Sequence, residues 1–114
     1  MNILLILKIL CALATIAVGL ISFLRPRSIK GFTGLEAPGP RGIAEVRAVL
    51  GGLFIGLGLA PFLLPVPAVY QALGIAYLAI AVARTVSLFL DRSFERSNII
   101  SLVIEILFGF IFIL

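Results

Sequence analysis

The fold is decided by the stretch EVRAVLGGLFIGLGLA, which occupies residues 45–60. Small residues recur at every fourth position in and beside it, so that on a helix they form one narrow groove into which a neighbouring backbone can settle closely. These positions are Ala44, Ala48, Gly52, Gly56 and Ala60. At about 100° per residue, Glu45 projects from the same face, whereas Arg47 points to nearly the opposite side. Such a helix belongs inside a bundle, and in a membrane its ionisable groups indicate a function or a paired partner.

Composition places the chain in a membrane. Of its 114 residues, 62% are hydrophobic and only 12% are charged, and the mean hydropathy is +1.29. Charged residues make up about a quarter of an ordinary soluble protein, so there are too few here to cover a soluble exterior. The pI near 10 does not indicate nucleic-acid binding, because the basic residues are few and gather in short connectors, as membrane orientation signals do. We therefore expect the lipid bilayer as a partner and no nucleic acid.

The chain has one cysteine and neither histidine nor tryptophan. Cys11 lies in an apolar run, so no intramolecular disulfide can form. Histidine is the commonest metal ligand and the usual general base near neutral pH, and its absence makes catalysis a minority interpretation. The sequence predicts no catalytic residue, no cofactor and no metal site.

Four apolar segments are long enough to cross a hydrocarbon core of roughly 30 Å. We predict helices at about 3–24, 43–64, 68–90 and 98–114, so that residues 1–114 form a single all-α domain, an integral membrane bundle of four transmembrane helices. The first segment differs from a signal peptide, because its only charge, Lys8, lies inside the run and apolar residues continue past Ala14. We expect it to be an uncleaved helix.

The other three helices also carry stripes of small or polar residues at helical spacing, which we expect to face the bundle. The stripe of the first helix is Lys8, Ala12, Thr15, Gly19 and Ser22, and that of the fourth is Asn98, Ser101, Glu105, Gly109 and Phe112. The third helix has an alanine stripe, expected to be a packing face, and a second stripe that carries polar groups. The alanine stripe is Ala72, Ala76, Ala79, Ala83 and Ser87, and the second is Tyr70, Tyr77, Arg84 and Asp91.

Five residues make up a candidate intramembrane polar cluster: Glu45, Arg47, Tyr77, Arg84 and Glu105. Arg84 sits about 10 Å inside the end of its helix, where a bare charge costs roughly 2.5 to 3.5 kcal/mol. In an antiparallel hairpin Arg84 and Glu105 lie at one level, roughly 10 to 15 Å from the membrane edge, so we expect them to pair. Lys8 is the rival partner of Glu105, since it lies within about 5 Å of the same depth, but it can also snorkel to the near surface.

The connector 25–42 combines basic residues with apolar ones. The basic residues are Arg25, Arg27, Lys30 and Arg41, and the apolar ones are Ile29, Phe32 and Leu35. This pattern fits a segment that lies on the bilayer surface with its basic residues toward lipid phosphates. An ordinary anchoring loop is the simpler interpretation.

A resemblance rests on an ordered set of residues: Glu45-Val-Arg47, Gly51-Gly52, Gly56-Leu-Gly58, Ala83-Arg84 with Asp91, and Glu105. The set resembles a family of small bacterial four-helix membrane proteins known only as a domain of unknown function. The likeness spans nearly the whole chain. It implies the four-helix membrane fold and a location in the bacterial inner membrane, and it implies no activity. Lys8 is not part of the pattern.

Three classes of function remain open. The favoured one is a non-enzymatic accessory or assembly protein, whose groove and charge pairs bind helices of its own copies or of a larger membrane complex. The second is a small ion or solute transporter or channel. Small multidrug exporters and fluoride channels also have four helices, but the exporters carry their essential carboxylate in the first helix, where this chain has Lys8. The third is a binder of a lipophilic small molecule such as a quinone or a lipid, or an enzyme acting on one, with Tyr77, Arg84 and Glu105 at a pocket between helices.

Orientation follows from the charges of the connectors. Six basic residues lie in loops 25–42 and 91–97 on one side of the membrane, opposite the Pro65-Val-Pro67 turn and two uncharged tails. The positive-inside rule therefore predicts both loops in the cytoplasm and both termini outside. In a Cys11→Ala background, an impermeant thiol reagent added to intact cells should label Ala68→Cys and not Gly31→Cys. Labelling of Gly31→Cys would contradict this orientation.

Overall fold

The computed structural model describes residues 2–114 and contains no strand in that range. The elements in chain order are α1 (Ile3–Leu24), η1 (Pro26–Ile29), α2 (Lys30–Thr33), α3 (Pro40–Glu45), η2 (Val46–Leu53), α4 (Phe54–Leu63), α5 (Pro67–Leu90) and α6 (Arg96–Ile113). Four helices are long and apolar enough to cross a membrane, namely Ile3–Leu24, Pro40–Leu63, Pro67–Leu90 and Arg96–Ile113. The all-α class with four candidate membrane spans is confirmed.

The second span is one continuous helix made of α3, η2 and α4. It begins at Pro40 rather than near residue 43, because proline fits the first helical turn, where its missing N–H forfeits no hydrogen bond. Its middle, Val46–Leu53, is π-helical. Because a π-helix has wider turns, the side chains of α4 are rotated about the helix axis relative to the positions that a regular α-helix would give them. Pro61 lies inside α4 without ending it, and the helix continues to Leu63.

Two compact units divide the chain, and each is described by itself. The α1–α4 unit comprises Ile9–Pro65. The α5–α6 unit comprises Val66–Leu114 together with the described residues up to Lys8. That residues 1–114 form a single domain stays a prediction.

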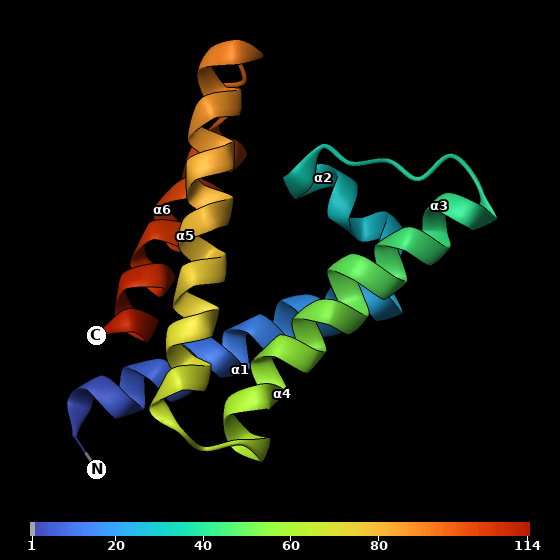
Figure 1. Cartoon of the computed structure of the whole chain (residues 1–114). Helices are drawn as coiled ribbons and strands as arrows, with labels where there is room; N and C mark the ends of the chain where they lie inside the picture. The colour runs from blue at the N-terminus through green and yellow to red at the C-terminus, as the bar shows by residue number, and fades with distance from the viewer. Residues whose placement is uncertain (1) are drawn as a thin grey trace. The chain divides into compact units, whose positions relative to one another are not determined.

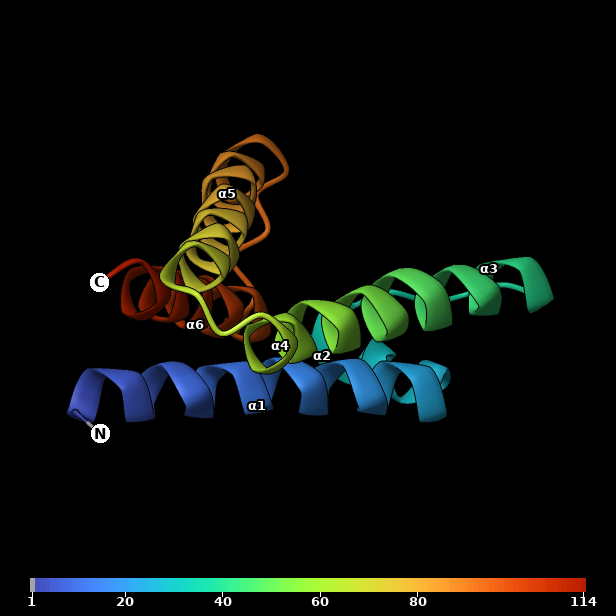
Figure 2. The same ribbon diagram turned by 60° about the horizontal axis from the view of Figure 1, so that its bottom comes forward.

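In the α1–α4 unit, α1 runs antiparallel to the second span, and the two backbones touch at glycines (Figure 2). A Cβ placed on Gly19 would lie only 2.8 Å from the carbonyl oxygen of Gly51 and 2.8 Å from the nitrogen of Ile55. A Cβ on Gly58 would lie 2.8 Å from the carbonyl oxygen of Ala12. Real side chains do not tolerate such distances to backbone atoms, so glycine is required for this approach.

The side of α1 that enters this contact is the predicted one. The buried residues of α1 are Cys11, Ala12, Thr15, Gly19 and Ser22. The hydroxyl groups of Thr15 and Ser22 donate to carbonyl oxygens one turn earlier, at 2.9 and 3.1 Å, so that neither is buried without a hydrogen bond. The stripe predicted for the first helix is therefore confirmed from Ala12 to Ser22.

The predicted groove of the second span is not the face that meets α1, and that the groove packs against another helix stays a prediction. Ala44, Ala48, Gly52 and Gly56 are exposed, Ala60 is half-buried, and Gly51 and Gly58 are buried instead. A Cβ on Gly56 would meet nothing within 4 Å. Spacing gives the physical reason: Gly51 and Gly58 are seven residues apart, as are Ala12 and Gly19, so the two pairs match in an antiparallel register. Gly52 and Gly56 have no such counterpart on α1.

In the α5–α6 unit, the two helices run side by side as an antiparallel hairpin (Figure 1, yellow to red). Their closest approach is at Gly74 and Gly109, where a Cβ on Gly74 would lie 2.8 Å from the carbonyl oxygen of Gly109. On α6, Glu105, Gly109 and Phe112 are buried, as predicted for its stripe.

The alanine stripe of α5 is not the face that packs on α6. Ala72, Ala79 and Ala83 are exposed, and Ala76 and Ser87 are half-buried. The seam with α6 instead has heptad spacing: Tyr70, Gly74, Tyr77, Ala81, Arg84 and Leu88. The aromatic rings and the guanidinium group fill this interface together with the small residues Gly74 and Ala81.

The contact between α1 and the second span predicts that Gly→Ala affects the stability of the protein differently at Gly19 and at Gly56. Gly19→Ala should lower the thermal stability of the protein in detergent, because overpacking of this kind costs about 1 to 3 kcal/mol. Gly56→Ala should leave stability unchanged or raise it, because alanine favours a helix by about 1 kcal/mol where space is open. Equal losses for both variants would contradict the backbone contact between α1 and the second span.

Candidate functional site

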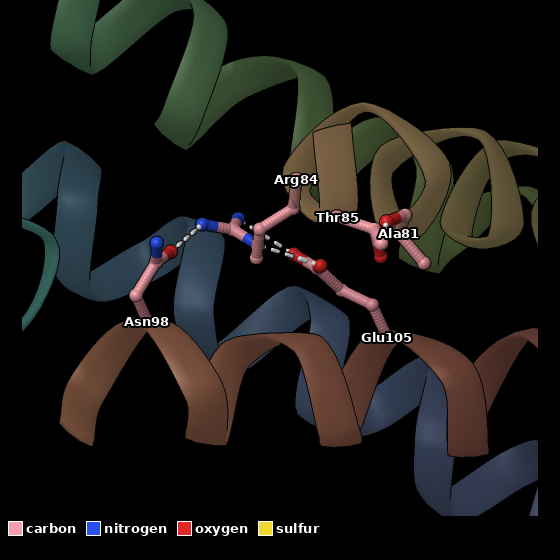
Figure 3. Close-up of polar contacts among 5 residues, drawn as sticks. All are labelled: Ala81, Arg84, Thr85, Asn98 and Glu105. Carbon is pink, nitrogen blue, oxygen red and sulfur yellow. Dashed lines mark hydrogen bonds and ion pairs between the residues drawn. The ribbon is translucent and has the colours of Figure 1, made fainter. Parts of the chain in front are cut away.

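Arg84 of α5 and Glu105 of α6 form a bidentate ion pair (Figure 3). Arg84 Nε donates to Glu105 Oε1 and Arg84 Nη2 donates to Glu105 Oε2, both at 2.7 Å. Glu105 is only 8% exposed. The pair predicted from depth is therefore present, and its fork geometry is the strongest that an arginine and a carboxylate can adopt.

Asn98 extends the ion pair toward the α5–α6 turn. Its side-chain oxygen accepts from Arg84 Nη1 at 2.7 Å, and its amide nitrogen donates to the Ser93 carbonyl oxygen at 2.9 Å and to the Ser93 hydroxyl at 3.1 Å. Ser93 in turn donates to the carboxylate of Glu95, which lowers the pKa of that exposed carboxyl group. The polar groups thus run in one hydrogen-bonded series from Glu105 to the polar turn.

This arrangement limits what the site can do chemically. Both oxygens of Glu105 accept from a guanidinium group, which stays protonated at any pH a protein meets. A proton cannot hop through arginine, so the series does not connect Glu105 to solvent as a relay. Among the described residues, no buried side-chain nitrogen or oxygen lacks a hydrogen-bond partner. The geometry suits a group that holds two helices together rather than one that transfers protons.

Tyr77 lies in the same interface but belongs to an aromatic cluster. Its ring makes an edge contact with Phe108, with centroids 5.5 Å apart, and stacks on Phe112 at 5.9 Å. Tyr70 also stacks on Phe112, at 6.1 Å. Lys8 lies 5.6 Å from the centre of the Tyr70 ring, so its ammonium group has a cation–π partner. Arginine, not Lys8, is therefore the partner of the α6 carboxylate.

The other two residues of the predicted cluster lie in the α1–α4 unit and have local roles. Glu45 pairs with Arg41, four residues earlier on α3, and both side chains are exposed. Arg47 Nη1 donates to the carbonyl oxygen of Phe23 at 2.8 Å, and its guanidinium lies 5.8 Å from the Phe23 ring. Arg47 thus satisfies a carbonyl group in the last turn of α1, which has no partner within its own helix. Arg84 and Glu105 contact each other, while Glu45 and Arg47 bind different residues.

Sequence reasoning missed several partners that the structure supplies. Arg41 and Glu45 are four residues apart, the spacing of an ion pair on a helix, so their contact could have been predicted from the sequence. Asn98 was placed on the correct face of its helix, but its bond to Arg84 was not foreseen. Gly74 was overlooked because the residues four positions before and after it, Tyr70 and Leu78, are large, so it belongs to no stripe of small residues.

The fold and this site define a class: a small membrane protein with four candidate spans and a bidentate, partly buried Arg–Glu pair between the last two. The chain belongs to the family described as a domain of unknown function (DUF4345), whose model matches residues 3–114. No curated protein and no solved structure matches it. The match confirms the predicted membership of a family of unknown function, and it assigns no activity.

The ion pair predicts a specific pattern of loss and rescue. Glu105→Gln should lower the yield of folded protein, because an uncompensated buried charge costs about 3 to 5 kcal/mol. Adding Arg84→Gln should partly restore the yield, since the unpaired charge is then gone. Adding Lys8→Met instead should not restore it. Rescue by Lys8→Met alone would move the functional pairing to α1, and a normal yield for Glu105→Gln would show that the pair does not stabilise the fold.

Proposed function

We propose that the protein is a non-enzymatic accessory or assembly partner of a membrane complex. The observation that carries this proposal is a face of the second span that α1 leaves uncovered within the α1–α4 unit. We call it the outer small-residue face: Ala44, Ala48, Gly52 and Gly56, all of them exposed. The chain uses other glycines, Gly19, Gly51 and Gly58, for its own close contacts.

The outer small-residue face has the chemistry of a helix-binding surface. A Cβ on Gly56 would have no neighbour within 4 Å, and one on Gly52 would meet only the Arg47 carbonyl oxygen at 3.8 Å. In a bilayer there is no hydrophobic driving force between helices, so association depends on close van der Waals contact, which small residues allow. A transmembrane helix of a partner protein is the occupant that gains most from such a surface.

The ion pair supports a non-enzymatic role. Arg84 and Glu105 neutralise each other in a bidentate contact, so neither offers a free group to a substrate or a moving proton. A transporter or an enzyme that used Glu105 would need that carboxylate to exchange partners. The contact with Asn98, which holds the guanidinium from a second direction, opposes such an exchange.

The proposal places the protein in the bacterial inner membrane, with both termini outside and with loops 25–42 and 91–97 in the cytoplasm. The distribution of basic residues supports this orientation. It also leaves the polar turn next to the Arg84–Asn98 contact on the cytoplasmic side.

Partner binding tests the proposal through matched leucine substitutions. The tagged full chain, extracted in mild detergent from its native host, should retain a stoichiometric membrane protein. Gly56→Leu should weaken that association by about 1 to 3 kcal/mol, roughly 5- to 150-fold in affinity, because the added side chain separates the helices. Ala17→Leu, on an exposed position of α1, is the control and should retain the partner.

Both variants should keep the thermal stability of the unmodified protein, which separates lost binding from lost folding. Retention of the partner by Gly56→Leu would contradict the assigned face. Co-purification of a stoichiometric quinone or lipid without a protein would favour the lipophilic-ligand class. Ion- or proton-coupled flux in liposomes, abolished by Glu105→Gln in a folded protein, would favour transport.

A further inference from the structure

The segment that follows α1 contains a cavity, which is separate from the Arg84–Glu105 ion pair and from the outer small-residue face. A cavity of about 200 Å³ opens between η1, α2 and the loop after them. Its lining residues are Pro26, Arg27, Lys30, Leu35, Glu36 and Ala37. The first of them lies two residues beyond Leu24, the end of a membrane span. We therefore expect the cavity at the level of the lipid headgroups.

The charges around the cavity favour an anion. Lys30 Nζ lies 3.2 Å from Glu36 Oε2, so the only acidic group of the lining is already paired. Among the described residues, Arg25 and Arg27 form no ion pair, and both are exposed. The residues 25–37 thus hold three basic groups against one acidic group, and two guanidinium groups remain for an external partner.

The apolar side chains of the same segment favour a lipid over a free ion. Pro26 and Ile29 are buried and attach the short helices to the unit. Phe32 and Leu35 are 48% and 53% exposed. Exposed aromatic and aliphatic residues beside unpaired arginines, at the end of a membrane span, are typical of segments that lie in the headgroup region of a bilayer.

We propose that residues 25–37 form an interfacial site for an anionic phospholipid. Arg27 and Lys30 bind its phosphate group at the cavity, Arg25 adds attraction from the rim, and Phe32 and Leu35 lie among the first acyl carbons. Glu36 keeps the Lys30 ammonium at the mouth of the cavity. The site does not depend on which helix occupies the outer small-residue face.

Lipid retention by the purified full chain tests this site. In neutral detergent, native mass spectrometry should show phosphatidylglycerol bound in preference to phosphatidylcholine. Each basic residue near an anionic surface contributes about fivefold in affinity, so Arg27→Gln with Lys30→Gln should weaken phosphatidylglycerol binding by roughly 30-fold. The control is Arg92→Gln with Arg96→Gln, which removes the same charge from the other basic loop and should retain the lipid.

Three results would overturn the proposal. They are equal retention of the two lipids, equal losses in the two double variants, and complete displacement of phosphatidylglycerol by inorganic phosphate, which would identify a free anion as the ligand. The melting temperatures of both double variants should match that of the unmodified protein, since all four side chains are exposed. A lower melting temperature for the Arg27 and Lys30 variant alone would assign these residues to the fold instead.

Depth in the bilayer gives a second readout that folding does not affect. The chain contains no tryptophan, so Phe32→Trp introduces a single fluorophore. In vesicles of phosphatidylglycerol and phosphatidylcholine, brominated acyl chains should quench it and iodide should not. Quenching by iodide without quenching by brominated lipid would place the segment in water and contradict the proposal.

Discussion

An ionised group in hydrocarbon must have a partner of opposite charge, and the hairpin of α5 and α6 is built around that requirement. Arg84 reaches both oxygens of Glu105 only when the two helices have one relative register. The same register brings Gly74 against Gly109, where the backbones meet, nearly three turns from Arg84 on α5 and about one turn from Glu105 on α6. A slip of one turn would separate the charges and drive side chains into the glycine contact. The ion pair and the glycines therefore specify the same arrangement.

The sequence predicted well those features that depend on length, hydropathy and depth. Four apolar runs gave the four candidate spans, and counting residues from the α5–α6 turn brought Arg84 and Glu105 to the same level. Membrane helices make this possible, because a rise of about 1.5 Å per residue converts position in the chain into depth. The polar stripes of α1 and α6 were recovered for a related reason, since few polar residues occur on these helices and each of them needs a partner.

Rotation about a helix axis was harder to predict than depth. The second span carries small residues on two faces, and the regular four-residue spacing of Ala48, Gly52 and Gly56 drew attention to the face that does not meet α1. The choice between the faces depends on the partner helix, where Ala12 and Gly19 match Gly58 and Gly51. The seam of α5 with α6 contains larger residues, Tyr77 and Arg84 among them, and that the alanine stripe of α5 is a packing face stays a prediction. The bonds of Arg47 and Asn98 depend on rotamers and neighbouring backbone, which spacing alone does not specify.

Two surfaces of the α1–α4 unit take no part in the contacts within that unit, and their chemistry differs. The outer small-residue face is smooth and almost without charge, so it suits another helix within the bilayer. The segment 25–37 is basic and partly apolar, so it suits the bilayer surface itself. These surfaces and the neutralised ion pair are the basis of the proposal that the protein holds other membrane components in place. This account requires that Glu105 be a permanent partner of Arg84.

The most direct test of that requirement is the ionisation state of Glu105 in a bilayer. An infrared difference spectrum between the unmodified protein and Glu105→Gln, recorded in lipid vesicles at neutral pH, isolates the vibrations of this one side chain. We predict the two stretching bands of an ionised carboxylate and no carbonyl band of a carboxylic acid. A carbonyl band from protonated Glu105 would show that Arg84 does not hold it as an ion pair, and would contradict the account.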